Sequence, residues 1–211
     1  MYFLIIVIVA FLLYAVFKRR TLVKQVELFN KLLYIEKSPE KYINEINKIL
    51  LKVQSDNERN INFIQKTTGL FYAGRFEEAI NILKNEVKKI PPNWQHIYYH
   101  NLILSLYFNG DIEEGNNVFS EADEILKIYA KKEYNKAAID LIYAISDFYN
   151  GKGLIRKDFF MNLKETGRND YRIAIAYYFL SKINEDEDNI EESELNLEKA
   201  QIYGQGSFIE R

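Results

Sequence analysis

Apolar residues recur every three or four positions along most of the chain, which is the spacing that places them on one face of an α-helix. Polar interruptions with Gly or Pro separate these stretches, and the alternation typical of β-hairpins is missing. The pattern predicts an all-α fold of five antiparallel helix pairs, spaced by about 36 to 40 residues. One pair falls within 21–53, and the other helices are expected over 57–73, 76–89, 94–108, 112–130, 134–150, 155–166, 170–184 and 190–203.

The first 17 residues contain no charge, Gly or Pro and are apolar almost throughout. As a helix they would span roughly 25 Å, close to the thickness of a bilayer core, and Lys18, Arg19 and Arg20 could reach the headgroups. Residues 1–20 are therefore predicted to be a transmembrane anchor in the lipid bilayer. A cleaved signal peptide is the alternative, but its basic start and small-residue cleavage site are missing.

The distribution of charge predicts on which side of the membrane the domain after the anchor lies. Residues 18–54 carry nine Lys and Arg against four Asp and Glu, whereas residues 55–211 carry 19 against 26. A basic stretch directly after the apolar segment predicts a single-pass protein whose C-terminal domain is cytoplasmic. The acidic remainder gives no footprint for nucleic acid.

Two stretches of the sequence align without gaps at an offset of 36 residues. Residues 74–80 read GRFEEAI and residues 110–116 read GDIEEGN, and Leu83 then aligns with Phe119. A weaker third copy begins at 189–193 with NIEES and continues to Leu197 and Ala200. The chain therefore contains an internal repeat of helix, turn and helix.

This repeat resembles the tetratricopeptide repeat (TPR) family, whose unit of about 34 residues has small and large residues at fixed positions. The matching positions are the turn glycines Gly74 and Gly110, the small residues Ala79, Gly115, Ser193, Ala122 and Ala200, the large residues Leu83, Phe119 and Leu197, and the closing Pro91. Glu86 departs from the pattern where Ala is usual. The resemblance implies a right-handed α-solenoid, with an irregular helical bundle as the alternative.

The resemblance also implies a binding surface, because the first helix of each pair lines the concave groove in that family. By that register a protein partner would contact Phe71, Tyr72, His100, Leu104, Tyr107, Phe108, Tyr178 and Lys182. The acidic run over 185–194 is interpreted as a solvated helix start, and an acidic docking surface is its alternative.

Catalytic and metal-binding patterns are weak. The chain has no Cys, so thiolate sites and disulfides are excluded. His96 and His100 are four residues apart on a helix, but no third metal ligand is evident, and neither a phosphate loop nor a serine elbow occurs. No enzyme activity, metal or cofactor is expected.

The predicted organisation is an anchor over 1–20, a juxtamembrane helix pair over 21–56, TPR-like repeats over 57–203 and a frayed tail over 204–211. The predicted function is a membrane-anchored scaffold or adaptor for protein–protein interaction. The alternative is an extracytoplasmic chaperone or translocon-associated factor with the opposite topology.

Overall fold

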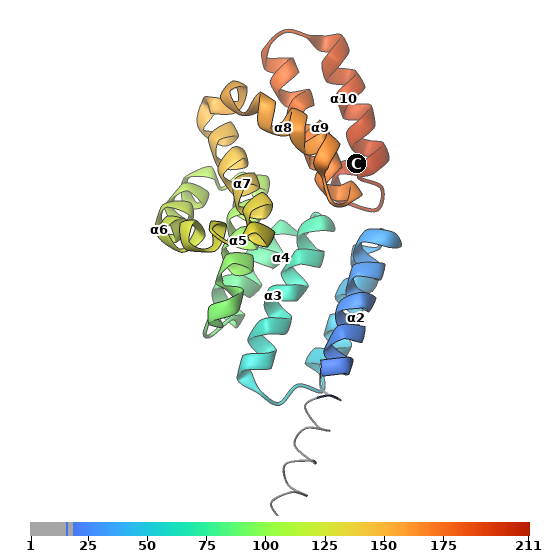
Figure 1. Cartoon of the computed structure of the whole chain (residues 1–211), viewed down its shortest axis with the longest axis vertical. Helices are drawn as coiled ribbons and strands as arrows, with labels where there is room; N and C mark the ends of the chain where they lie inside the picture. Colours follow the sequence, from blue (N-terminus) through green and yellow to red (C-terminus); the bar gives the residue numbers. More distant parts are fainter. Residues whose placement is uncertain (1–15, 17–18) are drawn as a thin grey trace, which may run out of the picture.

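The computed structural model describes residue 16 and residues 19–211 (Figure 1). Almost all of the predicted transmembrane anchor, residues 1–15 together with 17 and 18, lies outside the described residues. Among the helices of the described part, none combines the length and the apolar character needed to cross a membrane.

The described residues form an all-α structure without strands, which confirms the all-α part of the predicted fold. A helix over 19–30 continues as a π-helical turn, η1 (Lys31–Ile35), and nine numbered α-helices follow. These helices are α2 (Pro39–Leu50), α3 (Asp56–Tyr72), α4 (Phe76–Asn81), α5 (Gln95–Asn109), α6 (Ile112–Ala130), α7 (Glu133–Asp147), α8 (Lys157–Thr166), α9 (Asp170–Asp186) and α10 (Ile190–Tyr203).

The predicted helix boundaries are within three residues of the observed ones, except where an α-helix passes into a π-helical turn before it ends. The helix predicted to end at 89 contains α4 and the π-helical turn η2 (Ile82–Glu86), and the chain becomes extended at Val87. Similarly, α7 passes into the π-helical turn η4 (Phe148–Lys152) and the 3₁₀ turn η5 (Gly153–Arg156) before α8. A 3₁₀ turn, η3 (Pro92–Trp94), precedes α5.

The same backbone device ends the first helix of each helix pair in the described part. Lys37, Gly74, Gly110, Gly151 and Asp188 all have positive φ angles, between 49° and 90°. The left-handed residue lets the next N–H turn back and donate to the helix it has left, as from Arg75 to the Leu70 carbonyl at 2.9 Å. The bonds from Asp111 to Leu106 and from Asn189 to Asn184 repeat this geometry at 2.9 Å. The internal repeat is therefore present in the backbone even where Lys or Asp replaces Gly.

Small residues early in the second helices permit close packing on the first helices. A Cβ atom placed on Gly115 of α6 would lie 2.9 Å from the Tyr107 ring of α5. Ala79 of α4 is fully buried, and the Ser193 hydroxyl of α10 donates to the Ser181 carbonyl of α9 at 2.9 Å. The small positions of the repeat are thus contacts between the two helices of a pair.

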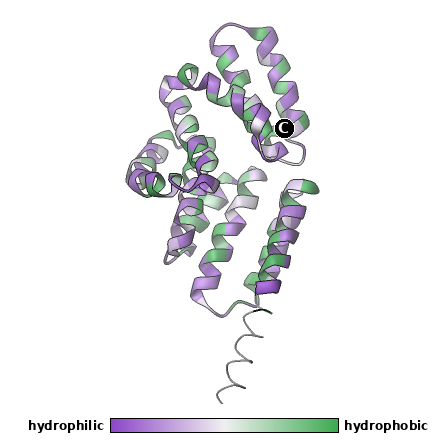
Figure 2. Ribbon diagram, in the orientation of Figure 1, coloured by the Kyte–Doolittle hydropathy of each residue, from purple (hydrophilic) through white to green (hydrophobic). Residues whose placement is uncertain are grey.

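Alternating polar and apolar colours along the helices in Figure 2 reflect their amphipathic sequences. Most of the buried apolar residues form one large core that extends from Phe29 in the first helix to Ile209 near the C-terminus, and two smaller clusters form around Ile64 and Leu83 and around Ile43 and Leu70. Because helices at both ends of the sequence contribute to this core, the series of pairs curves back on itself.

The C-terminal residues belong to this core, so the prediction that 204–211 fray is wrong. Phe208, in the 3₁₀ turn η6 (Phe208–Glu210), packs on Phe71, Phe76 and Phe108 with ring centroids 5.0 to 5.4 Å apart. The C-terminal turn lies next to the end of α10 and above α2 in Figure 1. The glycines at 204 and 206 favour a frayed end, but Phe208, two residues after Gly206, packs in the core and holds the C-terminal segment in place.

Candidate binding pocket

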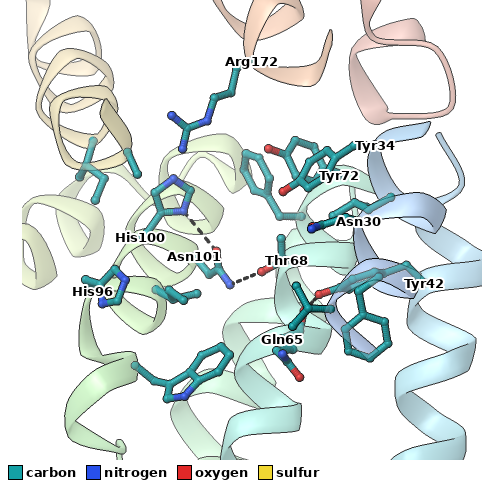
Figure 3. A pocket seen from close by; sticks show the side chains of 18 of the residues that line it. Asn30, Tyr34, Tyr42, Gln65, Thr68, Tyr72, His96, His100, Asn101 and Arg172 are labelled. Carbon is teal, nitrogen blue, oxygen red and sulfur yellow. Dashed lines mark hydrogen bonds between the residues drawn. The ribbon is translucent and has the colours of Figure 1, made fainter. Parts of the chain in front are cut away.

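A cavity of about 410 Å³ lies on the inner side of the curved array (Figure 3). Its walls come from the first helix of every pair, with Tyr42 of α2 and Trp94 before α5 as additions. The other lining residues are Val26, Phe29, Asn30, Leu33 and Tyr34 of the first helix, Gln65, Thr68, Phe71 and Tyr72 of α3, His96, Ile97, His100 and Asn101 of α5, Ala138, Ile139 and Ile142 of α7, and Arg172 of α9. The volume falls within the range of about 300–1,000 Å³ typical of small-molecule sites.

Asn101 fixes one wall of the pocket. It is a buried amide in an otherwise apolar part of α5, and its Nδ2 donates to the Ile64 carbonyl of α3 at 3.1 Å. The same nitrogen lies 3.0 Å from the Thr67 hydroxyl and 2.9 Å from the Thr68 hydroxyl. Because a buried polar group is costly without partners, this network fixes the register of α5 against α3.

The Asn101 side chain also sets the tautomer of His100. Its Oδ1 lies 3.2 Å from the His100 Nδ1, and an amide oxygen can only accept, so Nδ1 carries the proton. Burial, followed by the nearby charge of Arg172, lowers the pKa of His100 to about 4. His100 is therefore a neutral imidazole at neutral pH, and its Nε2 is an acceptor.

His96 lies one helical turn before His100 on the same side of α5. Its ring stacks on Tyr129 with centroids 4.6 Å apart, and its buried Nδ1 has no hydrogen-bond partner in the described part of the chain. Burial and then the charge of Lys132 lower its pKa. Nowhere in the described residues do three His, Asp or Glu side chains converge as metal ligands.

Arg172 enters the pocket from the first turn of α9. Its backbone N–H donates to the Asn169 side chain at 3.0 Å, and this capping bond fixes the start of the helix. Arg172 is a partly buried residue, and its guanidinium forms neither a hydrogen bond nor an ion pair with any described residue. Asp170 pairs instead with Lys37 at 2.7 Å. Figure 3 shows the guanidinium directed toward His100.

The charge of Arg172 reaches the tyrosines at the same end of the pocket. Burial raises the pKa of Tyr34, and the guanidinium opposes that rise. The pKa of Tyr72 is also raised by burial, again with an opposing contribution from Arg172. No Asp or Glu is among the described residues that line the pocket, so its field is positive in a chain of net charge −2.

Three of the eight predicted partner-contact residues, Phe71, Tyr72 and His100, line the pocket. The structure places the others elsewhere. Leu104 and Tyr107 are buried in the core, Phe108 packs on Phe208, Tyr178 packs on Phe108, and Lys182 pairs with Glu185 at 2.9 Å.

Sequence reasoning missed Asn101, Trp94 and Arg172 as pocket residues. Asn101 carried a usable signal, because a lone amide within an apolar helical run needs buried partners. Arg172 carried none, since an arginine in the first turn of a helix is ordinarily solvated. Only the folding of α9 over the first helices brings it to the pocket.

Comparisons with protein-family models, curated proteins and solved structures find no match for the chain. The described residues themselves form a curved array of helix hairpins with a pocket on its inner side.

Proposed function

We propose that the chain is a membrane-anchored scaffold that binds a protein partner on the inner side of a right-handed, TPR-like α-solenoid. The observation that carries this proposal is the repeated left-handed turn at Lys37, Gly74, Gly110, Gly151 and Asp188. Regularly spaced helix hairpins are the unit of solenoid proteins, which use their concave surfaces for binding.

The composition of the pocket supports the inner side as the binding surface. Its lining residues belong almost entirely to the first helices of the pairs, as the TPR register predicts. Among the second helices, α6 and α8 each expose one large apolar residue, Ile128 and Met161, and α10 exposes four, Ile190, Leu195, Leu197 and Ile202. Helical periodicity places Ile190 and Leu197 on a different side of α10 from Leu195 and Ile202, so they do not form one continuous apolar stripe.

The membrane anchor in this proposal rests on the sequence of residues 1–20 and the basic residues that follow. In the proposed topology the helical domain faces the cytoplasm. A reporter fused after Arg211 tests it: activity confined to the cytoplasm is expected, and activity only outside would favour the extracytoplasmic alternative.

Site-specific photocrosslinking in the native cell tests the partner surface. A benzophenone amino acid placed at Ile97, which lines the pocket on α5, is expected to capture one discrete protein. The matched control places it at Ile128 on α6, which is 60% exposed and is not among the lining residues. Capture of the same protein with equal yield at both positions, or at Ile128 alone, would reject the inner side as the binding surface.

A further inference from the structure

The pocket contains an uncompensated positive charge at one end of an apolar chamber. Arg172 has no acidic partner among the described residues, and none of the described lining residues is acidic. A partly desolvated guanidinium without a counter-ion loses solvation and gains no ion pair in return. An anionic group bound there would form that ion pair and compensate for the lost solvation.

The neighbours of Arg172 complement an oxygen-bearing group. Figure 3 places Tyr34 and Tyr72 at the same end as Arg172, with His100 facing it. Hydroxyl groups and the planar guanidinium fork are donors to oxygen, and the fork matches a carboxylate with two parallel hydrogen bonds. The other walls are mostly apolar and include Phe29, Leu33 and Ile139, with the polar side chains of Asn30, Gln65 and Thr68 among them.

We propose that this pocket binds a small monocarboxylate with an apolar body, such as a medium-chain fatty acid, and that Arg172 pairs with its carboxylate. The inference concerns a free small molecule, so it stands independently of the protein partner proposed above.

The single positive charge of Arg172 favours a ligand with one negative charge over a ligand with two. The neutral state of His100 and the apolar remainder leave Arg172 as the cation available to a ligand among the described lining residues. A phosphate monoester, which carries about 1.5 to 2 negative charges at pH 7, would leave charge unpaired in the chamber. A cationic amphiphile would be repelled by the positive charge of Arg172.

Trp94 provides a built-in reporter, because it is the single Trp of the chain and lines the pocket. The full chain, held in phosphatidylcholine nanodiscs, is titrated with decanoate, decanol and decyltrimethylammonium while Trp fluorescence is recorded. A saturable change is expected with decanoate, at a half-saturation concentration about tenfold or more below that of decanol. No saturable change is expected with decyltrimethylammonium.

The variant Arg172→Gln should weaken decanoate binding about tenfold or more and leave decanol binding unchanged. Unchanged decanol binding shows that the pocket is intact, so a folding defect is distinguished from a lost ion pair. Arg168→Gln is the matched control, because Arg168 is exposed and lies outside the pocket lining. Since both proteins sit in the same lipid, partition of the probe cancels in their ratio.

Several outcomes would overturn the proposal. These are no saturable response to decanoate in the unaltered chain, equal affinities for decanoate and decanol, and Arg172→Gln binding decanoate like the unaltered chain. The crosslinking at Ile97 is unaffected by any of them, so this proposal and the partner proposal fail separately.

Discussion

Tyr72 of α3 and Tyr171 of α9 stack with ring centroids 4.5 Å apart and planes inclined by 28°. Tyr34 of the first helix contacts both rings edge-on, at 6.3 Å from each. These three side chains join elements from the two ends of the sequence. They hold the start of α9, and Arg172 with it, over the pocket.

Removal of the Tyr171 ring should open this junction. Tyr171→Ala deletes a side chain that is 1% exposed, so we expect the free energy of unfolding to fall by about 3–5 kcal/mol, as for other buried aromatic truncations. Chemical denaturation of the full chain measures this change. Tyr134→Ala is the control, because Tyr134 is 67% exposed and should change stability by less than about 0.5 kcal/mol.

The Tyr171 hydroxyl should behave in the opposite way to the ring. Its oxygen is buried and has no hydrogen-bond partner in the described part of the chain, and burial raises the pKa of the phenol. Tyr171→Phe removes an unsatisfied polar group and is expected to raise the free energy of unfolding by about 1 kcal/mol. A loss of stability would show that the hydroxyl has a partner.

Gly115 tests the close contact between α5 and α6. In a free helix Gly→Ala is favourable by about 1 kcal/mol, but here the new Cβ would lie 2.9 Å from the ring of Tyr107. That ring cannot move easily, since its hydroxyl donates to Asn116 Oδ1 at 2.7 Å and lies 2.9 Å from Ser146 Oγ. We therefore expect Gly115→Ala to destabilise the fold by about 1–3 kcal/mol in thermal or chemical unfolding.

Asn117→Ala is the matched control for that substitution, because Asn117 is an exposed residue of the same helix. It should be neutral or slightly stabilising, since Ala has the higher helix propensity. A stabilising Gly115→Ala would mean that the Tyr107 contact does not constrain α6.

His100 should make stability depend on pH. Its folded-state pKa is about 4 and its ordinary value is 6.5, so between these values the unfolded chain binds a proton that the folded chain does not. Stability from this group is therefore present above pH 6.5 and is lost as pH falls toward 4. The loss between pH 7 and pH 4.5 should be about 2 kcal/mol.

His100→Gln isolates this contribution, because Gln retains a donor for Asn101 but does not titrate. The free energy of unfolding is measured at pH 7 and at pH 4.5 for both proteins. We expect the decrease on acidification to be smaller in the variant by about 2 kcal/mol. Equal decreases would place the pKa of His100 near its ordinary value.

Asp188 tests the repeated turn. Its φ of 58° lies in the left-handed region, where residues with a Cβ atom are strained. Gly74 and Gly110 occupy the corresponding positions in two other pairs. Asp188→Gly should raise the free energy of unfolding by about 0.5–1 kcal/mol, because it relieves that strain. Asp188→Ala removes the same charge but keeps the strain, so it should give no gain. Equal effects of the two variants would point to charge rather than backbone strain.

Local patterns accounted for the elements of this protein. The period of apolar residues predicted the helices, and Gly74 and Gly110 marked two of the turns. The predicted helices 170–184 and 190–203 also placed a turn near Asp188, but the left-handed backbone at Lys37 and Asp188 was not predicted, because Lys and Asp do not mark it as Gly does. The helical register also brought Phe71, Tyr72 and His100 to the pocket.

By itself, the sequence determined that the chain forms helices, where most of them begin and end, and which faces are apolar, since those properties depend on residues three or four positions apart. Only the tertiary structure decided that η6 joins the core and that α9 closes over the first helices. These contacts connect residues about 100 or more positions apart, such as Phe108 with Phe208 and Tyr34 with Tyr171, so the local spacing of apolar residues cannot predict them. The charge of Arg172 in the pocket follows from that closure.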